Sequence, residues 1–281
     1  MKVYIYIMAT ILFLGLVACS EQQTTTVSQP MASDTTIVDT PTPPITPINI
    51  DTPSNSTILK ALNPRDLIET YFEDAQFKND KSATYKYEEE PMQVNYVGEQ
   101  SYQENGIDYV LTFFESFNLD KNGERDWGCH ACSGKLSIAQ FQKGEKGLTP
   151  IDFTYDCPCG TANMGGVSIP KVVLIGNRHF LEKNVGDMGQ RISIELLYYY
   201  DIKDYKELLK LTVAESNEGD APSKEEMYAY DATITHYKDD SKNMITVQYT
   251  GTTYTDDMSI IPHNKTETYT YNLEKQKFIK K

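Results

Sequence analysis

The sequence predicts a mainly β fold of the α+β class: an antiparallel meander that forms a curved sheet or a sandwich, with one N-terminal helix. Short runs in which apolar and polar residues alternate fill most of the chain after residue 90, and this period of two is typical of half-buried strands. Polar links of a few residues, such as 217–220 and 239–241, join consecutive runs. Parallel strands need longer crossovers, so we expect antiparallel pairing.

The expected helix begins at Asn63-Pro64, where Asn63 is a good N-cap and Pro64 suits the first helical position. An apolar stripe at helical spacing follows, formed by Leu67, Ile68, Tyr71 and Phe72. The polar segment 78–81 is expected to end the helix. A stripe of this kind is typical of a helix that packs on a core, so we expect it to cover the end of a sheet.

The first expected strands, residues 94–103 and 107–117, flank Asn105-Gly106, a dipeptide that favours a tight hairpin turn. The second of these strands carries apolar residues at both alternations, so we expect it to be covered on both faces. Further strands are expected at residues 171–176, 179–183, 192–198, 209–213, 228–234, 245–249, 266–273 and 277–280. The last two are expected to pair with each other.

Between these groups, the alternating runs 136–138 and 151–155 predict another hairpin. Gly144 lies where the first residue of a type II′ turn would lie. A turn at this place sets Ile138 opposite Ile151, and the apolar faces of the two runs then coincide. The same register, extended to the open end of the hairpin, brings the segments before and after it together.

The four cysteines of this region lie at that open end: Cys129, Cys132, Cys157 and Cys159. Opposed strand residues are close enough for disulfides, so the register favours nested bridges, Cys132–Cys157 and Cys129–Cys159. A slip of two residues would keep the faces matched and place Cys132 against Cys159. The cross-linking is therefore better specified than the pairing.

Two other chemistries remain open for the four cysteines. The spacing of Cys129 and Cys132 suits half of a zinc site, whereas Cys157 and Cys159 are one residue short of the usual spacing. A redox dithiol normally lies between a strand and a helix, and here a strand follows Cys132. Haem attachment needs histidine directly after the second cysteine, where this chain has Ser133. We expect structural disulfides, with no metal and no cofactor.

The N-terminus carries an export signal. Lys2 precedes a mostly apolar run, residues 3–17, of the length of a signal peptide. The run ends in Leu16-Val17-Ala18-Cys19, which resembles the lipobox of bacterial lipoproteins at all four positions. The resemblance implies cleavage after residue 18, lipidation of Cys19 and attachment to a membrane of the cell envelope. Ser20 after the cysteine resembles the default signal for the outer membrane, if the host has one.

This assignment divides the chain into three parts: a signal peptide (1–18), the lipidated Cys19 with a tether (19–58) and one β-rich globular domain (59–281). Residues 20–58 contain no aromatic residue and no Lys or Arg, and they are rich in Thr, Pro and Ser. Such a segment cannot bury enough apolar surface to fold, so we expect a disordered tether. With Cys19 lipidated, an even number of cysteines is left for disulfides in an oxidising compartment.

The Cys-His-Ala-Cys motif at residues 129–132, followed by strands and a glycine-containing loop, resembles a group of uncharacterised secreted bacterial proteins. The resemblance covers residues 127–190. Its relatives more often continue with Ala-Pro, where this chain has Ser133-Gly134. It implies an exported protein and supplies no activity.

The sequence offers few catalytic candidates. It has neither a GxSxG elbow nor an HExxH pair. His130 with Asp126 and Asp156 could meet near the bridges, although a histidine there more commonly bonds a loop carbonyl. A formal net charge of −14 argues against nucleic acid as a partner.

Two function hypotheses follow. The first is a non-catalytic lipoprotein of the cell envelope, a binding or structural module whose partner is an envelope protein or a glycan. For such a module, exposed tyrosines could form the binding face: Tyr199, Tyr237 and Tyr254. The second is a thiol–disulfide or zinc-binding envelope protein that acts through Cys129, Cys132, Cys157 and Cys159.

Overall fold

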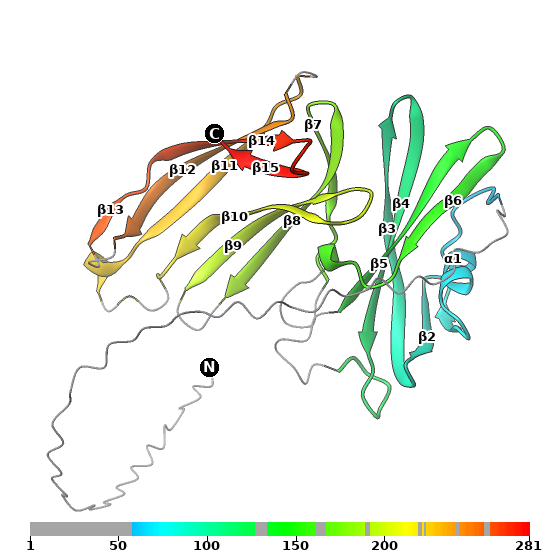
Figure 1. The fold of residues 1–281 in the computed structure, drawn as a ribbon. Coiled ribbons are helices and arrows are strands. Elements are labelled where there is room, and N and C mark those ends of the chain that lie inside the picture. The colour runs from blue at the N-terminus through cyan, green and yellow to red at the C-terminus, as the bar shows by residue number, and fades with distance from the viewer. Residues whose placement is uncertain are drawn as a thin grey trace, which may run out of the picture. The chain divides into compact units, whose positions relative to one another are not determined.

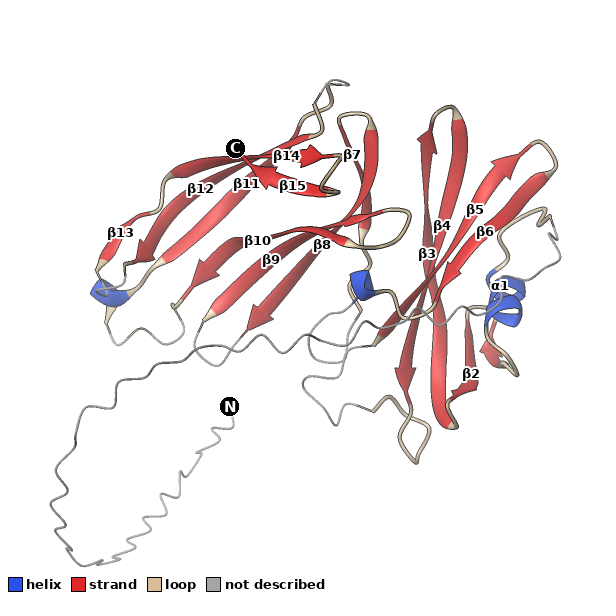
Figure 2. Ribbon diagram, viewed as in Figure 1, coloured by secondary structure: helices blue, strands red, loops and turns tan. Residues whose placement is uncertain are grey.

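The computed structural model describes residues 58–126, 134–160, 167–188, 192–218, 221, 223–239, 242–255 and 259–281. These residues lie in one compact unit, Thr46–Lys281. They form two antiparallel sheets in which strands follow one another almost entirely in chain order (Figures 1 and 2). The predicted mainly β, antiparallel meander with one N-terminal α-helix is confirmed.

Helix α1 (Pro64–Tyr71) begins where the sequence predicts. The Asn63 side chain accepts a hydrogen bond from the Arg65 N–H, and Pro64 occupies the first turn. Leu67 and Ile68 are fully buried, so the apolar stripe does pack on a core. The helix ends before the expected segment 78–81, because that segment belongs to a hairpin that the alternation did not indicate. Two short 3₁₀ helices, Pro158–Gly160 and Lys224–Glu226, lie in loops.

The first sheet has six strands in strictly sequential order. They are β1 (Gln76–Asn79), β2 (Ser82–Tyr87), β3 (Glu90–Glu104), β4 (Ile107–Asn118), β5 (Lys135–Gly144) and β6 (Gly147–Thr154). The turn between β3 and β4 is Asn105-Gly106, and both residues have positive φ, as the predicted tight hairpin requires.

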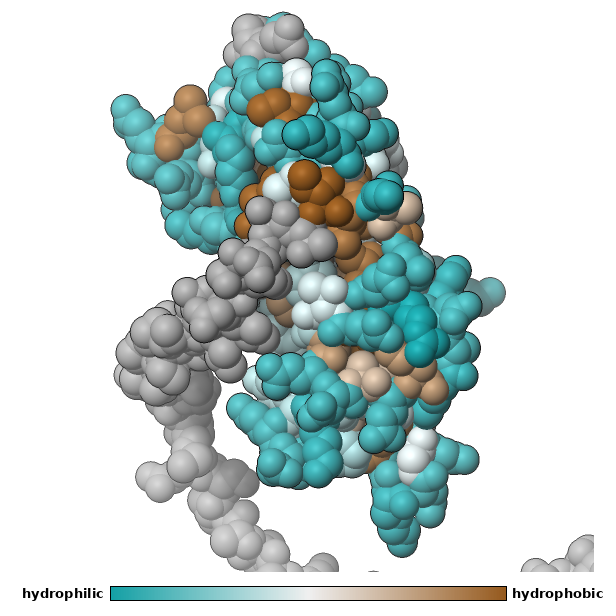
Figure 3. All heavy atoms as spheres, turned by 90° about the vertical axis from the view of Figure 1, so that its right-hand side faces the viewer, coloured by the Kyte–Doolittle hydropathy of each residue, from teal (hydrophilic) through white to brown (hydrophobic). Residues whose placement is uncertain are grey.

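The face of the molecule in Figure 3 is largely hydrophilic, with smaller hydrophobic areas between hydrophilic ones.

Strand β4 is buried on both faces, as predicted. On one face Val110 and Phe114 pack in a cluster with Leu67 and Ile68 of α1. On the other face Leu111 and its neighbours belong to a cluster that also contains residues of the second sheet. The first sheet is therefore a middle layer, with the helix on one side.

The second sheet has nine strands. They are β7 (Lys171–Ile175), β8 (Arg178–Met188), β9 (Ser193–Asp201), β10 (Glu207–Ser216), β11 (Ala229–His236), β12 (Met244–Tyr254), β13 (Ile260–Pro262), β14 (Lys265–Asn272) and β15 (Lys277–Lys280). The order is β15-β14-β12-β11-β10-β9-β8-β7, and β13 pairs with β12. The expected pairing of the last two strands is confirmed.

This second sheet curls so that its C-terminal strands reach back over its own face. Phe278 of β15 and Tyr271 of β14 lie 5.3 and 5.4 Å, between ring centroids, from Phe180 of β8. Five strands separate β8 from β15 in the sheet order, so these contacts require strong curvature (Figure 1). The concave face thus holds an aromatic core at one end.

The two sheets are joined by packing and by one side-chain amide. Buried residues of both sheets share a cluster that includes Phe113 of β4 and Leu181 of β8. Gln100 of β3 donates to the Pro170 carbonyl at 2.7 Å and accepts from the Val172 N–H at 2.8 Å. Its amide therefore supplies the hydrogen bonds that another strand would offer to the edge strand β7.

The chain enters the first sheet through an isolated bridge to its edge. The Leu59 N–H donates to the Leu148 carbonyl at 2.9 Å, and the Leu148 N–H donates to the Leu59 carbonyl at 2.8 Å. Leu148 belongs to β6, so the segment just before α1 is fixed to the outer strand of the first sheet.

We predict that Gln100→Ala destabilises the domain, because two backbone groups at the β7 edge lose their partner. The expected loss in free energy of unfolding is about 1–3 kcal/mol, measured by urea denaturation. Gln103→Ala on the same strand is the control, since the Gln103 amide bonds only an exposed Asp108 carboxylate. Equal losses in both variants would contradict a specific role for Gln100.

Candidate functional site

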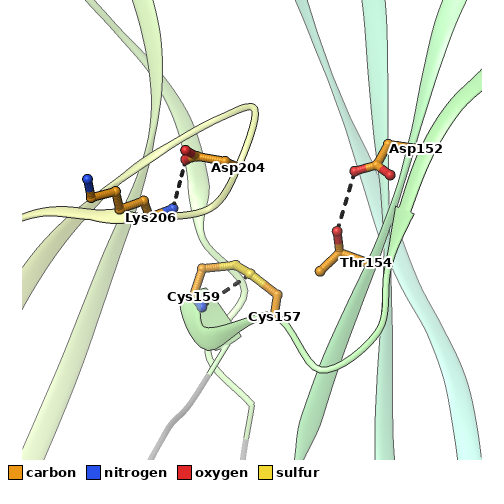
Figure 4. The surroundings of a disulfide bond; sticks show 6 residues. All are labelled: Asp152, Thr154, Cys157, Cys159, Asp204 and Lys206. Carbon is orange, nitrogen blue, oxygen red and sulfur yellow. Dashed lines mark hydrogen bonds between the residues drawn. A yellow bond between two sulfur atoms is a disulfide. The ribbon is translucent and has the colours of Figure 1, made fainter. Parts of the chain in front are cut away.

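The cysteine region differs from the prediction. Cys157 and Cys159 form a disulfide with each other, with Cα atoms 5.1 Å apart. Figure 4 shows this disulfide between Asp152 and Thr154 of β6 on one side and the β9–β10 turn on the other. Cys129, Cys132 and His130 lie outside the described residues. The predicted nested pairing, Cys132–Cys157 and Cys129–Cys159, is wrong for Cys157 and Cys159.

The register of the hairpin explains the difference. Gly144 pairs with Gly147, so the two turn residues are Glu145 and Lys146, one position later than predicted. A bulge then leaves Ile151 unpaired and 41% exposed, and Ile138 pairs with Thr154. The β6 strand is displaced by three residues from the predicted pairing. Cys157 consequently comes just beyond the strand end.

The disulfide is a local, buried feature. Cys157 and Cys159 are 1% and 0% exposed and pack in the cluster that both sheets share. The Cys157 N–H donates to the Leu136 carbonyl at 2.6 Å, which fixes this end of the hairpin. A disulfide that closes a ring of three residues lowers the conformational entropy of the unfolded chain only a little. The resulting stabilisation is about 1.6 kcal/mol, against about 3.5 kcal/mol for a nested bridge. The two cysteines therefore stabilise the fold mainly by packing in the core and less by their cross-link.

A polar cavity of about 470 Å³ opens on the concave face of the second sheet, beside the aromatic core, with which it shares Leu197 and Val213. Its apolar floor comes from β9, β10 and β11, with Leu197, Val213 and Ile234. The polar groups around it are Ser168, Lys171, Glu182, Asn184, Glu195, Asp231 and His236. We call it the concave cavity.

A carboxylate, an imidazole and a phenol meet in this cavity. Glu182 of β8 and His236 of β11 are 2.9 Å apart between Oε2 and Nε2, and the Tyr199 hydroxyl of β9 is 2.8 Å from the same Nε2. A carboxylate only accepts hydrogen bonds, so Nε2 carries a proton and donates to Glu182. Tyr199 also hydrogen-bonds to that carboxylate. Nδ1 is then the ring nitrogen of His236 that remains for another partner.

The electrostatics of this cluster keep Glu182 charged. Burial by itself raises the pKa of Glu182, but the hydrogen bonds from His236 and Tyr199 outweigh it, and the pKa lies below its ordinary value. Burial and the neighbouring Glu182 charge raise the pKa of Tyr199, so the phenol keeps its proton. The cavity therefore has a fixed negative charge beside apolar walls at neutral pH.

Sequence reasoning missed this cluster. His236 lies at the end of β11, and the sequence indicated no partner for it. Tyr199 was expected to be an exposed binding residue, which is wrong, because it is fully buried under Phe278. Tyr237 is 38% exposed, whereas Tyr254 donates to the Glu226 carbonyl. The available signal was Glu182, an acid two positions from Phe180 on the face that the alternation assigns to the core.

The other candidate triad cannot be completed from described residues, because His130 lies outside them. Asp156 pairs with Lys135 at 3.4 Å, and the Asp126 N–H donates to the Asn118 carbonyl. Among the described residues no group of three or more His, Cys, Asp and Glu is arranged to hold a metal ion. The same residues contain no helix that is both long and apolar enough to span a membrane.

Comparison with known proteins gives no match: no family model fits the chain, and neither a curated protein nor a solved structure is significantly similar to it.

We predict that a tryptic digest of the unreduced protein contains no cross-link between the peptides 126–135 and 147–171. The second peptide is expected two mass units lighter than after reduction, because its own two cysteines are joined. Liquid chromatography with mass spectrometry, before and after reduction, measures both. A cross-linked pair of these peptides would restore the nested bridges.

We predict that Glu182→Gln destabilises the domain at pH 7 by about 1–3 kcal/mol, since hydrogen bonds to a charged acceptor are lost. A carboxyl with a lowered folded pKa stabilises the protein above its unfolded pKa, about 4.3, and this contribution disappears as pH falls through the lowered value. The difference from wild type should therefore shrink below about pH 4. Chemical denaturation at several pH values tests it, with exposed Glu274→Gln as control. A difference that persists unchanged at pH 2 would contradict the charge argument.

Proposed function

We propose that this protein is a membrane-anchored lipoprotein of the cell envelope whose β-rich domain is a non-catalytic binding module. The observation that carries the binding role is the concave cavity with the charged Glu182 in its lining. Ligand pockets are commonly 300–1,000 Å³ in volume and combine apolar walls with a few fixed polar groups. The concave cavity, at about 470 Å³, has both properties.

The contacts in the cavity support binding more than catalysis. The Glu182 carboxylate and the His236 imidazole are hydrogen-bonded to each other, which fixes the orientation of both side chains. Ser168, the hydroxyl residue among the described lining residues, donates to the Asn184 carbonyl at 3.1 Å. Its O–H is thus not directed at His236, as a nucleophile activated by that imidazole would require.

The anchor rests on the sequence. Leu16-Val17-Ala18-Cys19 supplies the lipidation motif, and residues 20–58 supply a spacer without aromatic residues, Lys or Arg. Several acyl chains hold a protein stably at a membrane, whereas one chain holds it only marginally. A binding domain on such a spacer would reach partners within the envelope, a protein or a glycan.

The alternative is a thiol–disulfide or zinc-binding function through Cys129, Cys132, Cys157 and Cys159. Its support is the disulfide between two cysteines close in sequence. Thiol–disulfide exchange, however, requires access of a thiolate to a sulfur, and Cys157 and Cys159 are buried. Binding in the concave cavity is therefore the preferred function.

One preparation tests both parts of the proposal. The full chain, purified in detergent from a bacterial host, should have Cys19 as an acylated N-terminus by mass spectrometry, and Cys19→Ala should abolish the acylation. Immobilised wild type and Glu274→Gln should retain the same molecules from envelope extract, and Glu182→Gln should retain about tenfold less, as expected for a lost charged contact. An unmodified Cys19 would contradict the proposed lipid anchor. Equal retention by all three proteins would contradict the proposed binding site at Glu182.

A further inference from the structure

A second cavity, of about 400 Å³, lies at one end of the first sheet, where four neighbouring strands meet the β9–β10 turn. Its lining residues are Tyr102, Glu104, Tyr109, Gln140, Gln142, Ile151, Asp152 and Lys203. We call it the junction cavity. None of its residues belongs to the concave cavity, so the two sites can be tested separately.

The register of the sheet places these side chains in two rows. Tyr102, Tyr109 and Gln142 are directly opposed on β3, β4 and β5, and Gln140 is opposed to Asp152 on β6. Opposed residues on neighbouring strands project from the same face. One row therefore presents two aromatic rings followed by an amide, and the next presents an amide followed by a carboxylate.

The aromatic pair offers a flat apolar surface. The rings of Tyr102 and Tyr109 are stacked, with centroids 5.1 Å apart and planes 18° from parallel. The Tyr102 hydroxyl accepts from the Gln140 amide at 2.6 Å, which holds the inner ring in place. Tyr109 is the more exposed of the two rings. A rigid tyrosine can contact a ligand over a large area at little cost in conformational entropy.

The polar groups around this surface are mixed in kind. Asp152 and Glu104 supply acceptors, Lys203 supplies donors, and the amides of Gln140 and Gln142 have both. Lys203 and Glu104 pair at 3.5 Å, so their charges largely offset each other. A hydroxyl both donates and accepts, and a ring with several hydroxyls is the ligand that such a lining satisfies best.

A separate observation comes from the residues behind the cavity. Tyr205 is 2% exposed, and its hydroxyl has no hydrogen-bond partner among the described residues. Asp152 and Tyr102 both act on its pKa, after the larger effect of burial, so this buried phenol lies close to two lining residues. The Nδ1 atom of His179 likewise has no hydrogen-bond partner among the described residues. The centroid of the His179 ring lies 5.1 Å from that of Tyr102. Buried polar groups are normally satisfied, so hydrogen-bonding capacity remains beside this cavity.

We propose that the junction cavity binds a neutral or N-acetylated saccharide, with one sugar ring packed against Tyr109 and its hydroxyls bonded to Gln142, Asp152 and Lys203. The assignment goes beyond the proposed binding function at Glu182, because it names a glycan as the ligand of a second, separate cavity. An acidic sugar fits less well, because the Asp152 carboxylate would repel its carboxylate.

Isothermal titration calorimetry of the full chain tests the assignment with four probes: chitopentaose, cellopentaose, maltopentaose and trigalacturonate. We expect one of the first three to bind. Tyr109→Ala should weaken that binding at least about tenfold, as truncation of an aromatic anchor does, and Tyr109→Phe should preserve it. Tyr237→Ala, at an exposed tyrosine outside both cavities, is the matched control and should bind as wild type does. Glu182→Gln is measured in parallel to report on the concave cavity.

Each other outcome overturns the assignment. These outcomes are no binding of any probe, binding of trigalacturonate alone, or binding that Tyr109→Ala leaves intact. Loss of binding in Glu182→Gln with none in Tyr109→Ala would place the sugar in the concave cavity, which keeps the proposed function and rejects the junction site. Circular dichroism checks the fold of each variant. If Tyr109→Ala does not fold, Gln142→Ala and Lys203→Ala replace it, because both side chains are exposed.

Discussion

Burial of β4 on both faces is the constraint from which the rest of the fold follows. A strand with Phe113 on one face and Phe114 on the other, both almost fully buried, needs a layer on each side. Helix α1 provides one layer, and residues of the second sheet, such as Leu181, provide part of the other. The Gln100 amide completes this contact by satisfying the backbone of β7 where no strand is available.

The same arrangement accounts for the two cavities. The second sheet turns one face toward the first sheet, and its other face curls around an aromatic core that ends before the sheet does. The uncovered part of that concave face is lined by polar residues, among them Glu182. The junction cavity forms in the opposite way, where the ends of β3–β6 extend past the shared core toward the β9–β10 turn. Polar residues can occupy both places because neither lies within a packed layer.

Sequence reasoning found what depends on local pattern. The helix start at Asn63, the Asn105-Gly106 hairpin and most strands of the second sheet follow from capping, turn chemistry and alternation. Strand β1 was missed because residues 76–79 are mostly polar and form an exposed edge strand. The cysteine pairing was missed because the turn lies one residue later than predicted, which displaces β6 by two residues, and the bulge at Ile151 adds a third. A bulge leaves no clear trace in a pattern of period two.

The candidate sites depended on contacts between residues distant in sequence. Glu182, Tyr199 and His236 come from three strands, and the alternation gives the face of each but not their positions along the sheet. The bulges in β9–β10 pairing shift those positions further. Tyr102 and Tyr109, by contrast, flank the predicted hairpin turn and are opposed in it. Their proximity could have been inferred from the Asn105-Gly106 turn alone.

The bridge between Leu59 and Leu148 has a mechanical consequence. Tension on the chain before residue 59 would act first on two hydrogen bonds at the outer edge of β6, and only afterwards on α1 and the core beneath it. Pro150, two residues further along β6, has no N–H and cannot extend that pairing. A pull from the N-terminal side would therefore break the two hydrogen bonds between Leu59 and Leu148 while leaving the packed layers, and both cavities, in place.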